Sequence, residues 1–529
     1  MKKYYKIKLF TVLIFAGLLS ACDLDINENP NSATSSVITP DLTFPAVVAS
    51  TVYNQIYYGY AASAYFAGFQ VPGSGVSGYG DQYTYNYTSS SVTGAWTYIF
   101  EGLRDYNTII KKAEEDTKYA LFGGISHILK AYSYQLLVDA YGDVPYSEAL
   151  LGTDNYTPKY DKDSDVYQSL VAELDQAITI IKTNQDKVGD GVLALTGVND
   201  PVFAGSLSKW IQFANNIKLR LLVRAQGSNI DSFVQDAFSK FSAEGFLKED
   251  VFVDPGYNAN SQQNPYWTLY HSSVAGVAPQ SAQYFIPSKY VFSFYNGAKL
   301  TDNFRGALVY KGFPNTPSGR LADETNNPAS TRAIWFIGTG TGTASSDAKG
   351  ILKSRSAPAP LFFAANIYFL LAEAALTGHA LDGDVKTNFE KGITASFAFL
   401  ALSGTSTTLS NVSADVQTYL NDNAGNYLVN IDLADSNEKK LEAIITQKYI
   451  ALNILDSNEA WNEFKRTAYP KISSGTDPIY TFVSIDSQST HADGLPVRLV
   501  YPQSEYNLNG DNVPKITNAY SNPIFWDKD

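Results

Sequence analysis

Residues 164–181 read SDVYQSLVAELDQAITII, and this stretch decides the fold class. Its apolar side chains recur with the 3.6-residue period of an amphipathic helix, at Val166, Leu170, Val171, Leu174, Ala177, Ile178 and Ile181. Ser164 or Asp165 is placed to cap the start, because a short polar side chain there accepts a hydrogen bond from a free backbone N–H. The stretch predicts a helix with one face buried against neighbours.

The same period recurs in two groups of segments, at about residues 95–225 and 360–465. In the first group the periodic positions are Leu103, Tyr106, Ile110 and Ala113, then Ile125, Ile128, Leu129, Tyr132 and Leu136, then Leu207, Trp210, Ile211, Ala214, Ile217 and Leu221. In the second they are Ile367, Leu370, Leu371 and Ala374, then Leu441, Ile444, Ile445, Tyr449 and Leu452. Helices with one apolar face need neighbours that cover it, as in helical-repeat scaffolds. The sequence therefore predicts a mainly α scaffold without a fixed repeat length.

Two segments interrupt this pattern, at about residues 65–91 and 250–360. Both are rich in Gly, Pro, Ser, Asn and aromatic residues, and they contain few helical stretches. Long segments of this kind inside a compact protein are commonly functional, and loops on a rigid scaffold are where binding surfaces are usually built. We expect the ligand region in these two segments.

The first 40 residues have the pattern of an export signal followed by a tether. Four lysines precede an apolar run at residues 9–19, which is too short to span a membrane as a stable helix. Residues 19–22 (LSAC) match a lipoprotein cleavage box, so we expect residues 1–21 to be removed and Cys22 to carry lipid. Cys22 is the only cysteine in the chain. The polar stretch behind it predicts an extended tether over residues 22–40.

Composition excludes several classes of function. The formal charge is −13, and loss of the four signal-peptide lysines brings it to −17. So negative a protein repels phosphate backbones, and no Lys/Arg cluster offsets the charge, which argues against nucleic-acid binding. A single cysteine excludes an internal disulfide and thiol catalysis in the folded body, and the four histidines show no metal-ligand spacing. We expect no metal site among these residues and no cofactor, while the many Asp and Asn residues leave the binding of a calcium ion open.

The sequence carries no motif that points to an enzyme. No Gly-x-Ser-x-Gly turn accompanies a histidine, and the glycine pairs at residues 73–75 and 338–340 lack the lysine of a phosphate loop. Pairs of carboxylates, which a glycoside hydrolase needs, are unavoidable among 52 acidic residues and prove nothing. We expect a binding protein and not an enzyme.

Four segments together resemble one family. They are residues 141–150 (YGDVPYSEAL), 216–225 (NIKLRLLVRA), 367–375 (IYFLLAEAA) and 461–470 (WNEFKRTAYP). In this order, behind the cleavage box and the DINENPN run at residues 25–31, they resemble the SusD/RagB family of outer-membrane lipoproteins, in the SusD-like branch. The resemblance covers essentially the whole mature chain.

This resemblance has implications for fold, location and partner. It implies a single SusD-like domain over residues 41–529, with a tetratricopeptide-like scaffold of helix pairs and a large irregular loop-rich region. It also implies an outward-facing place on the outer membrane, held by the lipid on Cys22, and a SusC-like TonB-dependent transporter over which the protein sits as a lid. Most members bind glycans and some are associated with peptide uptake, so both ligand classes stay open. A third possibility is a surface protein that makes only protein contacts.

The motifs themselves have a structural interpretation. Gly142 suits a helix C-terminus that needs a left-handed residue, and Pro145 prevents the helix from resuming. Glu373 and Arg466 are expected to form an ion pair or to cap helices.

Candidate ligand contacts come from the aromatic residues of the loops. Sugar rings have apolar C–H faces and polar edges, so aromatic side chains can stack on them while amides and carboxylates bind the hydroxyls. Because they lie in Gly/Asn-rich loops and off any helical stripe, we expect contacts from Tyr79, Tyr83, Trp267, Tyr270 and Trp335. The alternative is that these rings hold the loops against the helical body.

Overall fold

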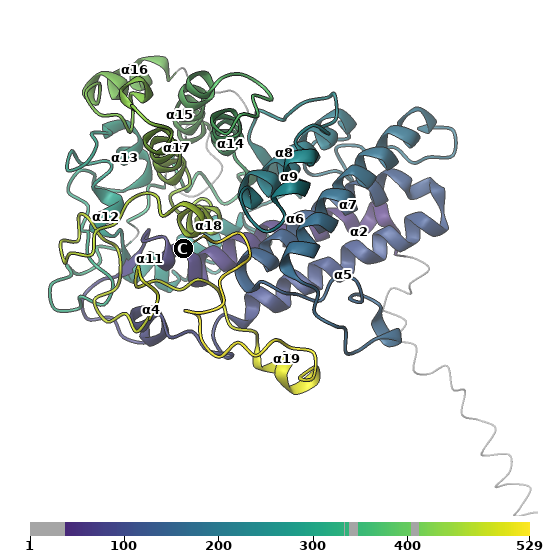
Figure 1. The fold of residues 1–529 in the computed structure, drawn as a ribbon, viewed down its shortest axis with the longest axis horizontal. Helices are drawn as coiled ribbons and strands as arrows, with labels where there is room; N and C mark the ends of the chain where they lie inside the picture. Colours follow the sequence, from purple (N-terminus) through teal and green to yellow (C-terminus); the bar gives the residue numbers. More distant parts are fainter. Residues whose placement is uncertain (1–37, 333, 338–347, 404–411, 529) are drawn as a thin grey trace, which may run out of the picture.

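The computed structural model describes most of the chain, in four ranges: 38–332, 334–337, 348–403 and 412–528. Cys22 and the predicted signal peptide lie outside the described residues, as does the predicted tether up to residue 37. In the described ranges the protein is mainly helical, which confirms the predicted fold class (Figure 1). No helix there is both long and apolar enough to span a lipid bilayer.

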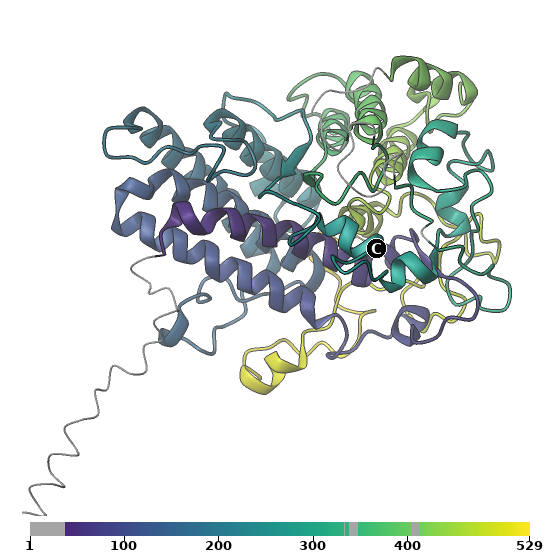
Figure 2. The same cartoon turned by 180° about the vertical axis from the view of Figure 1, so that it is seen from behind.

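The first helical group forms one half of the molecule. Its long helices are α2 (Pro40–Tyr58), α5 (Thr93–Glu115), α6 (Ala120–Tyr141), α7 (Asp163–Asn184) and α8 (Leu207–Ala225). Successive members pack against one another, α5 on α6, α6 on α7 and α7 on α8, and α2 lies across α5 and α6 (Figures 1 and 2). Each helix buries its apolar stripe on a neighbour, as the periodicity predicted.

The second helical group forms the other half. It contains α14 (Ala364–Leu376), α15 (Val385–Ala401), α16 (Ser413–Asp422), α17 (Asn437–Ala451) and α18 (Ser457–Thr467). Helix α14 packs on α15 and α17, and it also contacts α8 of the first group. The buried apolar side chains of both groups belong to one continuous hydrophobic core.

Helix α2 was not predicted, because the scaffold was expected to begin near residue 95. It buries Phe44, Val48, Val52 and Ile56 on one side, but Val47, Thr51 and Gln55 are buried as well. A helix covered on most sides shows no polar stripe, and Pro45 inside it further obscures the pattern.

The predicted cap of α7 was wrong. The helix begins at Asp163, so Ser164 lies inside its first turn, and the preceding Lys162 makes no side-chain cap bond. The Asp163 carboxylate accepts hydrogen bonds from the N–H groups of Ser164 (2.8 Å) and Phe525 (3.0 Å). Asp163 therefore serves to attach the C-terminal segment, while acidic residues in this first turn favour the helix dipole.

In the described ranges, the predicted loop regions contain only short elements. Their helices are α3 (Ala64–Phe66), α4 (Gly80–Thr84), α10 (Pro265–Tyr270), α11 (Gln280–Tyr284), α12 (Lys289–Phe292) and α13 (Asn303–Val309). Two further short helices, α9 (Asp231–Ala237) and α19 (Gln503–Leu508), lie outside these regions. Two small antiparallel pairs join β1 (Val71–Pro72) to β3 (Phe285–Ile286) and β2 (Val251–Val253) to β4 (Ala359–Phe362). The first pair holds the two loop regions side by side.

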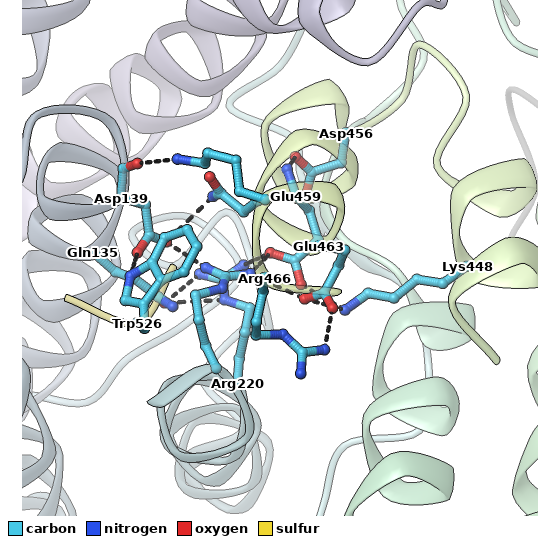
Figure 3. Close-up of polar contacts among 12 residues, drawn as sticks. Gln135, Asp139, Arg220, Lys448, Asp456, Glu459, Glu463, Arg466 and Trp526 are labelled. Atoms are coloured by element: carbon cyan, nitrogen blue, oxygen red, sulfur yellow. Dashed lines mark hydrogen bonds and ion pairs between the residues drawn. The ribbon is translucent and has the colours of Figure 1, made fainter. Parts of the chain in front are cut away.

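A buried network of charges joins the two helical groups (Figure 3). Arg224 of α8 donates to Asp139 of α6 and to Glu459 of α18, with Glu463 at 3.4 Å. Lys448 of α17 donates to Glu459 at 2.7 Å. Four helices thus meet through side chains that are almost completely buried.

The C-terminal segment completes this network. The indole N–H of Trp526 donates to Asp139 at 3.1 Å, and the Arg224 guanidinium lies over the same ring at 5.6 Å from its centroid. Trp526 is fully buried. Ile524 and Trp526, near the end of the chain, are therefore part of the core.

The structural interpretation of the family motifs is confirmed. Gly142 ends α6 with a φ of 76°, in the region that L side chains avoid. Arg466 makes a bidentate pair with Glu373, at 2.6 and 2.8 Å. Both residues connect α18 to α14, as expected of an ion pair and not of catalysts.

Candidate ligand-binding surface

Four of the five predicted contact residues are buried, and Tyr79, with 6% of its surface exposed, is the least enclosed of them. Trp267 and Tyr270 on α10 expose 1% of their surfaces, and Trp335 exposes none. Tyr270 and Trp335 meet edge to face at 5.8 Å, whereas Trp267 packs on His271 at 4.1 Å. This packing is what the loop-anchoring alternative describes. Contact of these three rings with a ligand would require the loops to open, and it stays a prediction.

The other two predicted residues lie close together and nearer the surface. Tyr79 and Tyr83 flank the start of α4, with ring centroids 6.2 Å apart. Tyr83 is partly exposed, and the Tyr79 hydroxyl donates to Gln280 Oε1 at 3.0 Å. Phe285 of β3 contacts Tyr79 edge to face at 5.5 Å, so the β1–β3 pairing brings both tyrosines to the second loop region.

A group of exposed tyrosines lies on the scaffold itself. Tyr53 and Tyr57 of α2 stack at 6.0 Å with an interplanar angle of 20°. Tyr98 of α5 meets Tyr57 at 5.2 Å and Tyr53 at 6.2 Å. Tyr53 and Tyr98 each expose 37% of their surfaces, which is unusual for rings that contact one another. These three rings present apolar faces to solvent.

The local sequence explains this arrangement. Positions four apart on a helix lie on one face, so Tyr53 and Tyr57 point the same way. Gly94 leaves room for the rings, since a Cβ atom there would lie 2.7 Å from the Tyr57 ring and 3.0 Å from that of Tyr98. The side-chain amide of Asn54 donates to the Tyr98 carbonyl at 2.8 Å and fixes α5 against α2.

A π-helical turn, η2 (Gly59–Ser63), continues α2 and carries the next ring, Tyr60. Asn458 of α18 secures the turn, because its amide donates to the Gln55 carbonyl at 2.9 Å and its oxygen accepts from Ser63 at 2.6 Å. Such turns are frequent at functional sites. Tyr60 lies at 5.8 Å from Tyr270, so it links the scaffold rings to the loop rings.

Together these rings form what we call the tyrosine surface, which comprises Tyr53, Tyr57, Tyr60, Tyr79, Tyr83, Tyr98 and Tyr284. Its members come from α2, η2, α5, α4 and α11, and Tyr284 is 38% exposed. The phenol oxygens of Tyr60, Tyr83 and Tyr284 each lie near enough to Tyr79 to raise its pKa further, beyond the rise that burial causes. The surface therefore runs from the helical half onto the loops.

Three phenols of the tyrosine surface, those of Tyr53, Tyr57 and Tyr60, are uncharged at ordinary pH. Burial raises the pKa values of Tyr53, Tyr57 and Tyr60 above the usual 10.0, and neighbouring phenol oxygens raise them further. Each phenol therefore keeps its proton and can donate or accept one hydrogen bond. Flat apolar faces with hydroxyls at their edges suit a neutral ligand that has both apolar and hydroxyl-bearing faces.

The scaffold tyrosines Tyr53, Tyr57, Tyr60 and Tyr98 were not among the residues predicted from the sequence. The signal was present as Tyr53, Tyr57 and Tyr60, spaced four and three residues apart as on one face of a helix. This spacing is informative only where a helix is predicted, and helix α2 was not predicted. In the described ranges, no group of three or more His, Cys, Asp or Glu could hold a metal ion.

The fold defines a class of helical-repeat binding proteins in which an irregular face is carried on helix pairs. The model of the SusD-like family, described as SusD and RagB outer membrane lipoprotein, matches residues 27–526. The chain belongs to this family of outer-membrane lipoproteins. No curated protein matches the sequence.

Solved structures of SusD homologues have the same fold. A chitin-binding SusD homologue from Flavobacterium johnsoniae is 21% identical, with a TM-score of 0.66 over 92% of this chain and 98% of the other. A SusD homologue from Bacteroides uniformis is also 21% identical, with a TM-score of 0.68 over 93% and 99%. A SusD-like protein from Bacteroides thetaiotaomicron is 21% identical, with a TM-score of 0.65 over 90% of this chain and 98% of the other.

Proposed function

We propose that this lipoprotein captures a neutral oligosaccharide or polysaccharide on its tyrosine surface and delivers it to a SusC-like TonB-dependent transporter. The observation that carries the proposal is the set of partly exposed, mutually contacting rings around Tyr57. Sugar rings can stack on such faces, and the phenol hydroxyls can bond to sugar hydroxyls. The chitin-binding homologue from Flavobacterium johnsoniae supports a glycan as the ligand class.

The predicted loop residues have two roles in this proposal. Tyr79 and Tyr83 contact the ligand where it passes from the scaffold to the loops. Tyr270 and Trp335 support Tyr60 from below, and Trp267 joins the contact set if α10 moves on binding. Each stacked ring contributes ~1–3 kcal/mol by analogy with base stacking. A few such contacts give weak capture, which suffices where a closed lid raises the local ligand concentration.

Binding to glycan and peptide arrays tests the ligand class. The mature chain (residues 22–529), held in detergent, should bind neutral glycans and leave peptides unbound. Binding of peptides alone would show that the lid serves oligopeptides. Binding to neither, with no transporter recovered on affinity purification from outer membranes, would favour a surface protein that makes only protein contacts.

Affinity for a neutral glycan should not change between about pH 6 and pH 9. The raised pKa values of Tyr53, Tyr57 and Tyr60 mean that each phenol stays protonated below its folded-state pKa, so no charge develops on these rings in that range. Calorimetric titrations at several pH values in one buffer system measure this. A titration centred near neutrality would instead indicate that a histidine or carboxylate dominates binding.

Substitution Cys22→Ser should release the protein from the outer membrane. A hydroxyl in place of the thiol cannot accept the thioether-linked lipid, so the anchor is lost while the folded body is unchanged. Fractionation and surface labelling of cells measure the location, with Ser20→Thr as a matched control beside the cleavage point. Retention of the C22S protein in the outer membrane at wild-type levels would contradict the predicted anchor.

A further inference from the structure

A ligand-sized cavity lies between α13 and α16. Its volume is about 390 Å³, within the range typical of small-molecule sites. Neither α13 nor α16 carries any residue of the tyrosine surface, and α16 lies at the outer edge of the second helical group (Figure 1). The tyrosine surface does not use this cavity.

The floor of the cavity is apolar. Phe304 lines it and is held by face-to-face stacking on Phe397 of α15, at 5.3 Å with an interplanar angle of 9°. Ala307 and Leu308, one helical turn further along α13, extend the same lining. This apolar floor can contact a hydrocarbon chain. The stacking on Phe397 fixes the Phe304 ring before a ligand binds.

One wall of the cavity carries two carboxylates. Asp415 and Asp422 both line it, and they lie seven residues apart on one face of α16. In the part of the chain that the structure describes, neither side chain has a hydrogen bond or an ion pair. Asp302, which also lines the cavity, is neutralised by Arg305. The unbalanced charge of the cavity is therefore negative.

Helix stability does not explain the acidic residue at the end of α16. Asp415 lies in the first turn, where the helix dipole favours a negative charge. Asp422 is the last residue of the helix, where the dipole disfavours a negative charge. Asp422 is exposed and Asp415 is partly exposed, so a cation that enters the cavity can reach both carboxylates.

The separation of the two carboxylates sets the shape of that ligand. Seven residues at about 1.5 Å per residue place them about 10 Å apart along the helix axis. That separation excludes a shared metal ion, and two carboxylates repel an acidic ligand. We infer that this cavity binds a linear diamine, whose two ammonium groups pair with Asp415 and Asp422 while its hydrocarbon chain lies on Phe304.

A series of diamines of increasing length tests this inference. Diaminobutane, diaminohexane, diaminooctane and diaminodecane are titrated calorimetrically into the mature chain, with octylamine as the single-charge reference. The affinity should pass through a maximum near diaminooctane, because its extended chain holds the two nitrogens at nearly the separation of the two carboxylates. General attraction to an acidic protein shows no such maximum, and an affinity that does not depend on length would overturn the inference.

Matched variants locate the site. Asp415→Asn and Asp422→Asn should each weaken diaminooctane binding about fivefold, the upper range for an exposed ion pair, and bring it near that of octylamine. Asp190→Asn removes the same charge from an exposed turn outside the cavity and should have no effect. Ala307→Tyr should block the cavity with both carboxylates in place. If D415N and D422N behave like D190N, the assignment is wrong.

These outcomes are independent of the glycan site. The D415N and D422N proteins should retain the glycan affinity of the wild type, because neither residue belongs to the tyrosine surface. Thermal unfolding of each variant shows whether the fold is intact. Loss of diamine binding with glycan binding kept supports two separate sites, whereas diamine binding that is lost only in tyrosine variants would contradict a site between α13 and α16.

Discussion

Replacement of Arg224 by methionine should lower the free energy of unfolding by about 3–5 kcal/mol. Methionine fills a similar volume but carries no charge, so Asp139, Glu459 and Glu463 keep their buried carboxylates and lose a shared cation. Lys448 still pairs with Glu459 and Glu463, at 2.7 and 3.1 Å, which limits the loss. Urea unfolding followed by circular dichroism measures the change.

The pH dependence of this loss follows from the carboxylates. Burial alone would raise the pKa of Glu463, but Arg466 and Lys448 hold it at about 2, and Arg224 and Lys448 likewise hold the pKa of Glu459 well below its usual value. In the wild type, this stabilisation is present above the unfolded pKa of about 4.3 and is lost as pH falls through the folded values. Without Arg224 the folded-state pKa values of Glu459 and Glu463 rise, so these carboxylates take up protons at a higher pH. The difference in the free energy of unfolding between the wild type and R224M should therefore narrow from pH 8 to pH 5.

Arg104→Met is the matched control. Arg104 of α5 is 68% exposed and forms only a 3.9 Å pair with its neighbour Asp105, so its loss should change stability by less than about 0.5 kcal/mol. If the free energy of unfolding of R224M lies within about 1 kcal/mol of the wild-type value, the network does not hold the two helical groups together.

The double substitution of Tyr57 and Tyr98 by alanine should weaken glycan binding on the order of a hundredfold. Each ring presents a face to solvent at the centre of the tyrosine surface, and a loss of about 1.4 kcal/mol per ring corresponds to tenfold in affinity. Both positions are partly exposed, so their truncation should leave the core intact. Calorimetry with chitohexaose, or with the tightest glycan from the array, measures the change.

Tyr156→Ala provides the control for this prediction. Tyr156 is 75% exposed and lies outside the tyrosine surface, so the substitution removes a ring of the same kind without touching the proposed site. Gly94→Val tests the geometry separately, because its side chain would displace the Tyr57 and Tyr98 rings without deleting them. Wild-type affinity in the double variant would place the ligand elsewhere on the molecule.

Helices such as α5 and α7 could be predicted because each exposes one polar face. The apolar stripe of 164–181 identified α7, and similar stripes identified α5, α6, α8, α14 and α17. Helix α2 could not be found this way, since neighbours cover it on several sides and the apolar period carries no contrast. Gly142 and the Glu373–Arg466 pair were predictable because their chemistry is local to a turn or to one pair of opposite charges.

The tyrosine surface could not be predicted from sequence for a different reason. Tyr57 and Tyr98 are 41 residues apart in sequence, and only the packing of α5 on α2 makes them neighbours. Whether an aromatic side chain in a loop can contact a ligand also depends on its burial, and composition carries no information about burial. Trp335 and Tyr83 both lie in Gly-rich loops, yet one ring is enclosed and the other is partly open to solvent.

The position of Trp526 bears on how the protein reaches the outer membrane. Its indole bonds to Asp139, which lies 387 residues earlier in the chain, so this contact cannot form until residue 526 has been synthesised. Incomplete chains have Asp139 and Arg224 without this enclosing ring and should unfold readily. A polypeptide that does not complete its core early remains unfolded and therefore competent for export. It can then reach its native state after translocation.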